Sequence, residues 1–256
     1  MSLTIKNLSF SYPDKAVLKN ISLSNLPKGK LTVLLGPNAA GKSTFFRSLA
    51  GLVDADYEQI LINDESLSEL TAAERTQRVC YMPQIFSTQA MLTVFEVVLL
   101  AQKQLNSWSV TEEDVQSVDA LLKQFEIEHL AQRYISELSG GQQQLVSICQ
   151  AMARSAELFL LDEPTSALDL RHQLQVMQRL KDETQQRDVI TIIALHDLSL
   201  AARFADNILL MKDGKLQGHG ETEFMFSSPL IEDIYGIEIE LFRNSKGSLV
   251  VTSELK

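Results

Sequence analysis

The fold of this chain is decided by the stretch Gly36-Pro37-Asn38-Ala39-Ala40-Gly41-Lys42-Ser43. It fits the pattern G-x-x-x-x-G-K-[S/T] of a phosphate-binding loop. A short apolar run, Leu31–Leu35, precedes the loop, and a helical stretch, Thr44–Leu49, follows it. In this context the backbone N–H groups of the loop and of the helix N-terminus supply positive charge to phosphate oxygens. We expect Lys42 to reach the β- and γ-phosphates of a nucleotide and the Ser43 hydroxyl to bind Mg²⁺.

Two more apolar runs, Leu158–Leu161 and Val189–Leu195, share the character of Leu31–Leu35. All three are too short for helices and show no alternation, which is typical of parallel strands buried on both faces. The later two end in Asp162-Glu163 and in His196-Asp197. In open parallel sheets, ligands bind beyond the carboxyl ends of the strands. The pattern therefore predicts an α/β core that binds a nucleotide or cofactor at that edge.

The pair Asp162-Glu163 predicts metal-assisted chemistry. Asp162 is expected to hold the hydration shell of the metal, because Mg²⁺ prefers carboxylate and water oxygens. Glu163 is placed to polarise an attacking water molecule. Two adjacent buried carboxylates are costly without a cation, which favours a metal site over a purely structural role.

The first residues and the middle of the chain show two different patterns. Leu8, Phe10 and Tyr12 alternate with polar residues, which predicts a half-buried antiparallel strand, and Ile21–Leu26 predicts a second one. Residues 86–155 change to helical periodicity and are expected to form a helical insertion. Apolar residues at helical spacing in that segment are Leu121, Leu122, Phe125, Leu145, Ile148, Cys149 and Met152.

Strands return near the end of the chain. Ile208–Met211 and Lys215–Leu216 flank Asp213-Gly214, which is a strong hairpin turn signal. A last strand pair is predicted around Glu238–Phe242 and Leu249–Thr252.

Composition sets the remaining expectations. With 23 Lys+Arg against 33 Asp+Glu the formal net charge is −10, which argues against a nucleic-acid partner. The two cysteines, Cys80 and Cys149, lie in apolar surroundings without metal-ligand spacing, as expected of a reduced, cytosolic chain. No apolar run reaches the roughly 18–20 residues needed to cross a bilayer, and Met1–Phe10 lacks the features of a signal peptide.

The segment Leu138-Ser139-Gly140-Gly141-Gln142, here called the signature segment, lies immediately before an amphipathic helix. Two glycines and a helix N-terminus predict a second anion site. The alternative is a flexible loop in which Ser139 caps the helix. If both phosphate-type sites are real, either the chain binds two nucleotides or two copies of it share each one.

The phosphate loop, the signature segment and Leu158–Glu163, in this order, resemble the ATPase subunit of ABC transporters over roughly residues 3–225. The resemblance implies an α/β fold with a P-loop NTPase core, a RecA-like parallel sheet, an N-terminal antiparallel β subdomain and an inserted α-helical subdomain. The expected division is a single domain, 1–256. Its parts are a nucleotide-binding core (1–85 and 156–225), a helical subdomain with the signature (86–155) and a short C-terminal extension (226–256).

The resemblance also implies roles for single residues. Tyr12 matches the aromatic residue that stacks on adenine, Gln84 the glutamine that touches Mg²⁺ and water, and His196 the histidine that contacts the γ-phosphate. Asp169 lies in a loop, Ser166–Asp169, that crosses the interface between two copies. These copies are expected to pack head to tail, so that Ser139, Gly140 and Gly141 of one face the ATP held by the other. The complete expectation is catalytic Glu163, His196 and Gln84; Mg²⁺ at Ser43, Gln84 and Asp162; and ATP at Tyr12, Gly36, Pro37, Asn38, Ala39, Ala40, Gly41, Lys42, Ser43, Thr44, Ser139, Gly140, Gly141, Gln142 and Asp169.

Two positions depart from the family pattern. Ala39 stands where the family usually has glycine, so a backbone position that tolerates any φ is restricted. Gln143 replaces the Arg or Lys that often follows the signature. Neither change removes a catalytic group, so we expect ATP hydrolysis to survive, with any effect falling on nucleotide affinity.

Two segments indicate a branch of the family. Leu195–Asp206 and Ile234–Ile239 resemble importers for ferric siderophores, haem and vitamin B12. That branch implies polytopic permease subunits as partners, with contact expected at Ile85–Thr93, and indirectly a solute-binding protein. The chain would then be peripheral on the inner face of the cell membrane. Alternatives are a soluble ABC-type ATPase, a subunit of a different ABC importer or exporter, or a binding module without turnover; the intact Glu163 and His196 disfavour the last.

Overall fold

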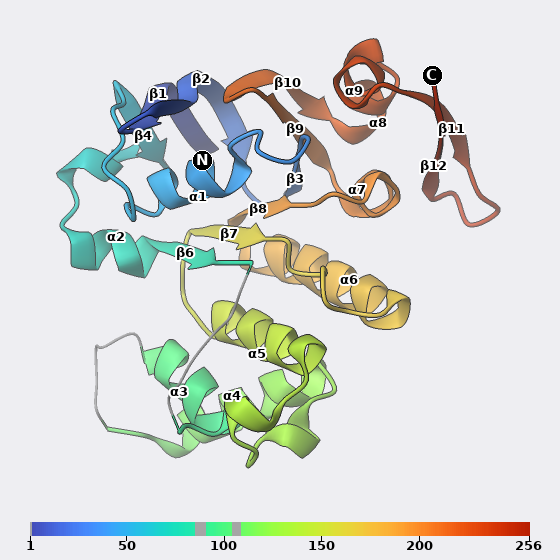
Figure 1. Cartoon of the computed structure of the whole chain (residues 1–256). Helices are drawn as coiled ribbons and strands as arrows, with labels where there is room; N and C mark the ends of the chain where they lie inside the picture. Colours follow the sequence, from blue (N-terminus) through green and yellow to red (C-terminus); the bar gives the residue numbers. More distant parts are fainter. Residues whose placement is uncertain (1, 85–90, 104–108) are drawn as a thin grey trace.

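The computed structural model describes residues 2–84, 91–103 and 109–256 of the chain. Its centre is a six-stranded sheet in the order β10-β9-β3-β8-β7-β6 (Figure 1). The three predicted runs form adjacent parallel strands, namely β3 (Leu31–Leu35), β8 (Ile190–Ala194) and β7 (Leu158–Asp162). Every residue of these strands is buried, which confirms the prediction of strands covered on both faces.

The neighbours of these three strands complete the sheet. β6 (Val79–Met82) extends it in parallel beside β7, and β9 (Asn207–Lys212) in parallel beside β3. β10 (Lys215–Glu221) pairs antiparallel with β9. The turn between them holds Asp213 at φ 51° and Gly214 at φ 77°, so the predicted hairpin is confirmed.

An antiparallel sheet covers one face of the central sheet (Figure 1). Its strand order is β2-β1-β4-β5, with β1 at Ser2–Tyr12, β2 at Lys15–Pro27, β4 at Gln59–Ile62 and β5 at Glu65–Ser66. The helix α1 (Lys42–Leu49) places Phe45 and Phe46 in the apolar core that joins the two sheets. The two predicted N-terminal strands are confirmed; β4 and β5 were not predicted.

Helices cover the other face of the central sheet. α6 (Leu170–Arg187) and α7 (Leu198–Phe204) bury Val176, Leu180 and Leu200 in one core with side chains of β3 and β8. This core continues into α3 (Val94–Lys103), α4 (Glu112–Gln124) and α5 (Gly140–Met152), which lie together at one end of the molecule (Figure 1). The predicted helical character of this segment is confirmed for its described residues, and the apolar face of α5 is buried.

Short elements link these layers. The helix α2 (Ala72–Arg78) precedes β6, and its Thr71–Glu74 capping box fixes where it begins. Single 3₁₀ turns lie at Leu67–Glu69, Glu128–Leu130 and Ile135–Glu137. The sequence patterns did not predict α2.

The last part of the chain packs back on the core. α8 (Thr222–Phe226) and α9 (Pro229–Tyr235) lead into β11 (Ile237–Arg243) and β12 (Leu249–Leu255). These two strands form the predicted pair, and their pairing is antiparallel. β12 packs against α7, where the Ser199 hydroxyl donates to the Val251 carbonyl over 3.4 Å.

Two further observations bear on the composition. Cys80 and Cys149 are both buried and free, and burial raises the pKa of the Cys80 thiol to about 11. Among the described residues, no helix combines the length and apolar character that spanning a membrane requires.

Candidate nucleotide site

The phosphate loop connects the end of β3 to the start of α1 and passes close to β9. Gly36 has φ 153°, and a Cβ atom built there would lie 2.2 Å from the Met211 carbonyl oxygen, so no side chain fits. Gly41 adopts φ 102° at the N-cap of α1. The N-terminus of α1 thereby points its free N–H groups into the loop, as anion binding requires.

Lys42 is buried, with 6% of its surface exposed. Its Nζ donates to the Gly36 carbonyl oxygen over 2.5 Å and to that of Pro37 over 3.3 Å. Desolvation lowers the pKa of Lys42, while the carboxylates of Glu163 and Asp162 act in the opposite direction. A buried ammonium group beside two carboxylates is therefore built into the floor of the loop.

Asp162 ends β7 and is 2% exposed. Burial raises the pKa of its carboxyl group, and the neighbouring Glu163 adds to that effect. Hydrogen bonds from Ser43 and Tyr81 and the charge of Lys42 oppose it, the Tyr81 hydroxyl lying 3.4 Å from Oδ2. The loop after β3 and the end of β7 thus meet through a hydroxyl and a carboxylate.

Glu163 lies between side chains from two other strand ends. Gln84, two residues beyond β6, donates from Nε2 to Glu163 Oε2 over 2.6 Å. Nε2 of His196, which follows β8, contacts the other carboxylate oxygen, Oε1. The Glu163 backbone has φ 52°, a left-handed conformation that carries strain for any residue with a Cβ. The fold holds this conformation through the Glu163 N–H, which donates to the Ala194 carbonyl over 3.1 Å.

Gln144 on α5 also holds this loop, and sequence reasoning missed it. Its side chain is 4% exposed; Nε2 donates to the Glu163 carbonyl over 2.7 Å, and Oε1 accepts from the Ala167 N–H over 2.7 Å. A glutamine at a buried helical position beside Leu145 is the signal that could have found it, because buried amides are hydrogen-bonded. α5 is therefore tied to the strand end that carries Glu163.

One cavity of about 760 Å³ collects most of the predicted residues. It is lined by Lys15, Val17, Asn38, Ala39, Ala40, Gly41, Lys42, Ser43, Thr44, Gln84, Glu163 and His196. The cavity offers backbone N–H groups, the ammonium groups of Lys15 and Lys42, hydroxyl oxygens, and the Glu163 carboxylate. This arrangement can bind a polyphosphate and hold a water molecule against it.

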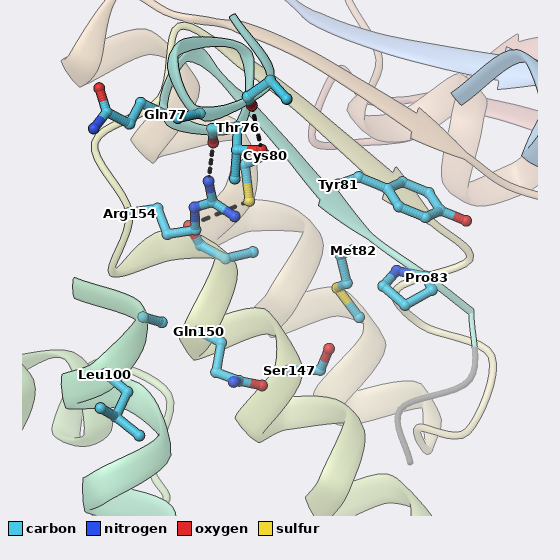
Figure 2. Close-up of a pocket in the computed structure, with 14 residues that line it drawn as sticks. Thr76, Gln77, Cys80, Tyr81, Met82, Pro83, Leu100, Ser147, Gln150 and Arg154 are labelled. Carbon is cyan, nitrogen blue, oxygen red and sulfur yellow. Dashed lines mark hydrogen bonds between the residues drawn. The ribbon is translucent and has the colours of Figure 1, made fainter. Parts of the chain in front are cut away.

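A second, largely apolar groove of about 790 Å³ lies between α2, β6, α3 and α5 (Figure 2). Leu100 of α3, Ser147 and Gln150 of α5, and Met82 of β6 face it (Figure 2). The Arg154 guanidinium donates to the Thr76 carbonyl at one end. Pro83 lines the groove, and the next residue, Gln84, contacts Glu163, so the segment that follows β6 joins the groove to the nucleotide cavity.

Comparison with known proteins decides the family. A family model described as ABC transporter matches residues 18–166. An uncharacterized ABC transporter ATP-binding protein of Methanocaldococcus jannaschii is 34% identical over 98% of this chain and 97% of its own length. The chain belongs to the ABC transporter family of ATPases. Its similarity to the hemin import ATP-binding protein HmuV of Thermobifida fusca is 33% identity over 93% of this chain and 84% of that protein. The petrobactin import ATP-binding protein FpuD of Bacillus anthracis is 32% identical over 94% of this chain and 88% of its own length.

Solved structures agree with this ABC ATPase fold. An inward-facing transporter assigned to the metal-chelate type superposes with a TM-score of 0.82 at 27% identity, covering 100% of this chain and 98% of that one. A dimeric ATP-binding cassette bound to ADP and Pi superposes with a TM-score of 0.76 at 27% identity, over 86% of this chain and 98% of that one. The predicted P-loop NTPase fold with its parallel sheet is confirmed.

In this ABC ATPase the signature segment lies apart from the phosphate loop. Ser139, Gly141, Gln142 and Asp169 line a separate cavity of about 580 Å³ that shares no lining residue with the nucleotide cavity. Ser139 caps α5, since its hydroxyl accepts from the Gln142 N–H over 3.4 Å. The helix cap therefore exists, and an anion site on the signature segment stays a prediction.

Two further predicted roles, for Tyr12 and for residues 85–93, are not tested by the lining of the nucleotide cavity. Tyr12 is 41% exposed and packs edge-on against Phe10 at 4.9 Å between ring centroids, and it does not line the nucleotide cavity. Stacking on adenine stays a prediction. Of the expected permease contact at Ile85–Thr93, residues 85–90 lie outside the described residues.

Ala39 adopts φ 61°, the left-handed conformation that glycine prefers. We predict that Ala39→Gly raises the free energy of unfolding by about 0.5–1 kcal/mol, because strain of about 1–2 kcal/mol is relieved while glycine adds flexibility to the unfolded chain. Urea denaturation without nucleotide measures the change. The control is Ala40→Gly, since Ala40 is buried and has no positive φ; it is expected to lower stability. A destabilised Ala39→Gly variant would contradict the prediction.

Proposed function

We propose that this chain is the ATP-hydrolysing subunit of an ABC importer for a siderophore-, haem- or cobalamin-type metal chelate. The observation that carries the hydrolytic part is the Glu163 carboxylate, which Gln84 and His196 hold beside the phosphate loop in one cavity. The solute class rests on relatives whose names state hemin and petrobactin import, and on the metal-chelate type transporter of similar structure.

The triphosphate would bind along the loop. N–H groups at the start of α1 face the cavity. Lys42 already donates to the carbonyl oxygen of Gly36, and a charged phosphate oxygen is a stronger acceptor for the same ammonium group. Burial makes an unpaired ammonium group costly, so Lys42 favours an anionic ligand within its reach. The loop and Lys42 are thus suited to the β- and γ-phosphates.

Ser43, Asp162 and Gln84 fit a Mg²⁺ ion. The described residues contain no group of three His, Cys, Asp or Glu side chains that could enclose a metal by themselves. A hydroxyl, an amide and one buried carboxylate instead provide part of an oxygen shell, which suits an ion that keeps waters and takes phosphate oxygens as ligands. When bound, Mg²⁺ would supply positive charge to the phosphate oxygens.

Glu163 would act as the general base. A carboxylate oxygen of Glu163 would accept a proton from the attacking water, while the Gln84 amide and His196 fix the direction in which that carboxylate points. The left-handed Glu163 backbone, secured by Gln144, keeps the group at the strand end. His196 would then contact the γ-phosphate as its position next to Glu163 allows.

The signature segment would complete the site of a second copy, in a head-to-tail dimer that encloses two ATP molecules. Within one chain it lines a different cavity from the phosphate loop. A Cβ built on Gly140 would meet nothing within 4 Å, so its backbone is open to an incoming phosphate. A head-to-tail dimer would bring the two half-sites together.

The groove of Figure 2 would receive a cytoplasmic segment of the membrane permease. It is lined mainly by apolar atoms, and its lining includes Pro83, which immediately precedes Gln84 in the chain. A permease segment that displaced Met82 and Pro83 would also displace the next residue, Gln84, which donates a hydrogen bond to Glu163. This gives a short physical route between transport and hydrolysis.

The hydrolytic proposal is tested with Glu163→Gln, which keeps the size of the side chain and removes its basicity. We expect ATP to bind and the chemical step to slow by about 10²- to 10⁴-fold. The variant should elute as a dimer in Mg-ATP and as a monomer in Mg-ADP on size-exclusion chromatography. Glu223→Gln, which changes only an exposed pair with Arg243, is the matched control and should behave as wild type. Full turnover by Glu163→Gln would show that Glu163 is structural.

The permease proposal is tested with Leu100→Glu, which adds a charge to the groove. We expect less of this variant to sediment with membranes from the source cells than of wild type, at unchanged ATPase rate of the isolated chain. Leu255→Glu, at an 89% exposed position near the C-terminus, is the control. Equal sedimentation of both variants would exclude the groove, and no sedimentation of wild type would exclude the partnership itself.

A further inference from the structure

The phosphate loop has a contact that none of the roles above uses. The side-chain hydroxyl of Tyr235, the last residue of α9, accepts a hydrogen bond from the Gly36 N–H at 2.8 Å. The two residues are 199 positions apart in the sequence. The C-terminal extension therefore touches the first residue of the phosphate loop directly.

Gly36 is held from three sides. Its N–H donates to Tyr235, its carbonyl oxygen accepts from Lys42 Nζ over 2.5 Å, and the Met211 carbonyl blocks the side where a Cβ would lie. If the hydroxyl were lost, the buried Gly36 N–H would have to turn toward another acceptor, because an unpaired buried donor is costly. Turning it would move the backbone that leads to the carbonyl on which Lys42 rests.

Tyr235 is itself fixed in place. α9 begins at the Ser228 cap with Pro229 in its first turn and ends at Gly236, whose φ is 70°. Ile231 anchors the helix with no exposed surface, and the Glu232 carboxylate accepts from the Ile239 N–H over 2.8 Å. The ring of Tyr235 packs on the main apolar core. Burial also raises the pKa of the hydroxyl, so it keeps its proton at neutral pH.

We propose that Tyr235 is a positioning residue of the phosphate loop: its hydroxyl orients the Gly36 peptide and so sets where the Lys42 ammonium meets the nucleotide. The inference rests on the proposed ATP site and adds the C-terminal extension to it. Tyr235 touches no nucleotide in this account; it acts through Gly36 and Lys42.

The test is Tyr235→Phe in the full-length chain, which removes only the hydroxyl. Titration with ATP and with ADP should show affinity reduced by about five- to tenfold, as expected for one buried donor left without its partner. Melting curves confirm that each variant is folded. Tyr57→Phe makes the same chemical change away from the loop and should bind as wild type. Val118→Ala removes packing at a fully buried position on α4, away from α9 and outside the cavity lining, so it should lower the melting temperature while leaving nucleotide affinity within twofold of wild type.

The outcomes separate the two proposals. Wild-type affinity in Tyr235→Phe would overturn the inference, and so would equal losses of affinity in Tyr235→Phe and Val118→Ala, because that result assigns the effect to a general loss of stability. Failure of the wild-type chain to bind either nucleotide would instead overturn the proposed ATP site.

Discussion

The parallel pairing of β6, β7, β8 and β3 is the constraint on which the site depends. Register places Met82 beside Leu161, Asp162 beside Ala194 and Leu34 beside Ala194, so the four strands end at one edge. The segments that follow them carry Gln84, Glu163, His196 and the phosphate loop. Residues distant in sequence meet there because the sheet leaves their strand ends side by side.

Charge is the second constraint. Lys42 and Asp162 are both buried. Burial disfavours the charged form of each, because it lowers the pKa of Lys42 and raises the pKa of Asp162. The charge of each group opposes the pKa shift of the other, and hydrogen bonds from Ser43 and Tyr81 also favour the charged form of Asp162. The site thus keeps ions in a poorly solvated place through mutual attraction, which is the arrangement that polyphosphate and a divalent cation require.

The sequence predicted those parts of the structure that local chemistry determines. Leu31–Leu35 and the Asp213-Gly214 hairpin were found because buried parallel strands are uniformly apolar and because this turn requires positive φ. The predicted lining of the nucleotide cavity came from motifs that concentrate their residues in short stretches. What each of those residues does, and how the chain divides into subdomains, stay predictions.

Other features left no local pattern. β4, β5, α2, α8 and α9 are short and lack strong periodicity. Gln144 contacts Glu163, 19 positions away in the sequence, and Tyr235 contacts Gly36, 199 positions away. Such contacts are visible only in the folded chain. Tyr12 shows the opposite case: its position in an alternating strand is correct, while its ring lies against Phe10 outside the cavity lining.

The central claim is that each ATP is held by the phosphate loop of one copy and the signature segment of another. The most direct test mixes two inactive variants, Lys42→Ala and Ser139→Arg. A mixed dimer pairs the intact loop of one with the intact signature of the other, so the account predicts that hydrolysis returns, to roughly a quarter of the wild-type rate if half the dimers are mixed and each has one complete site. A mixture that stays as inactive as its separate components would contradict the shared site.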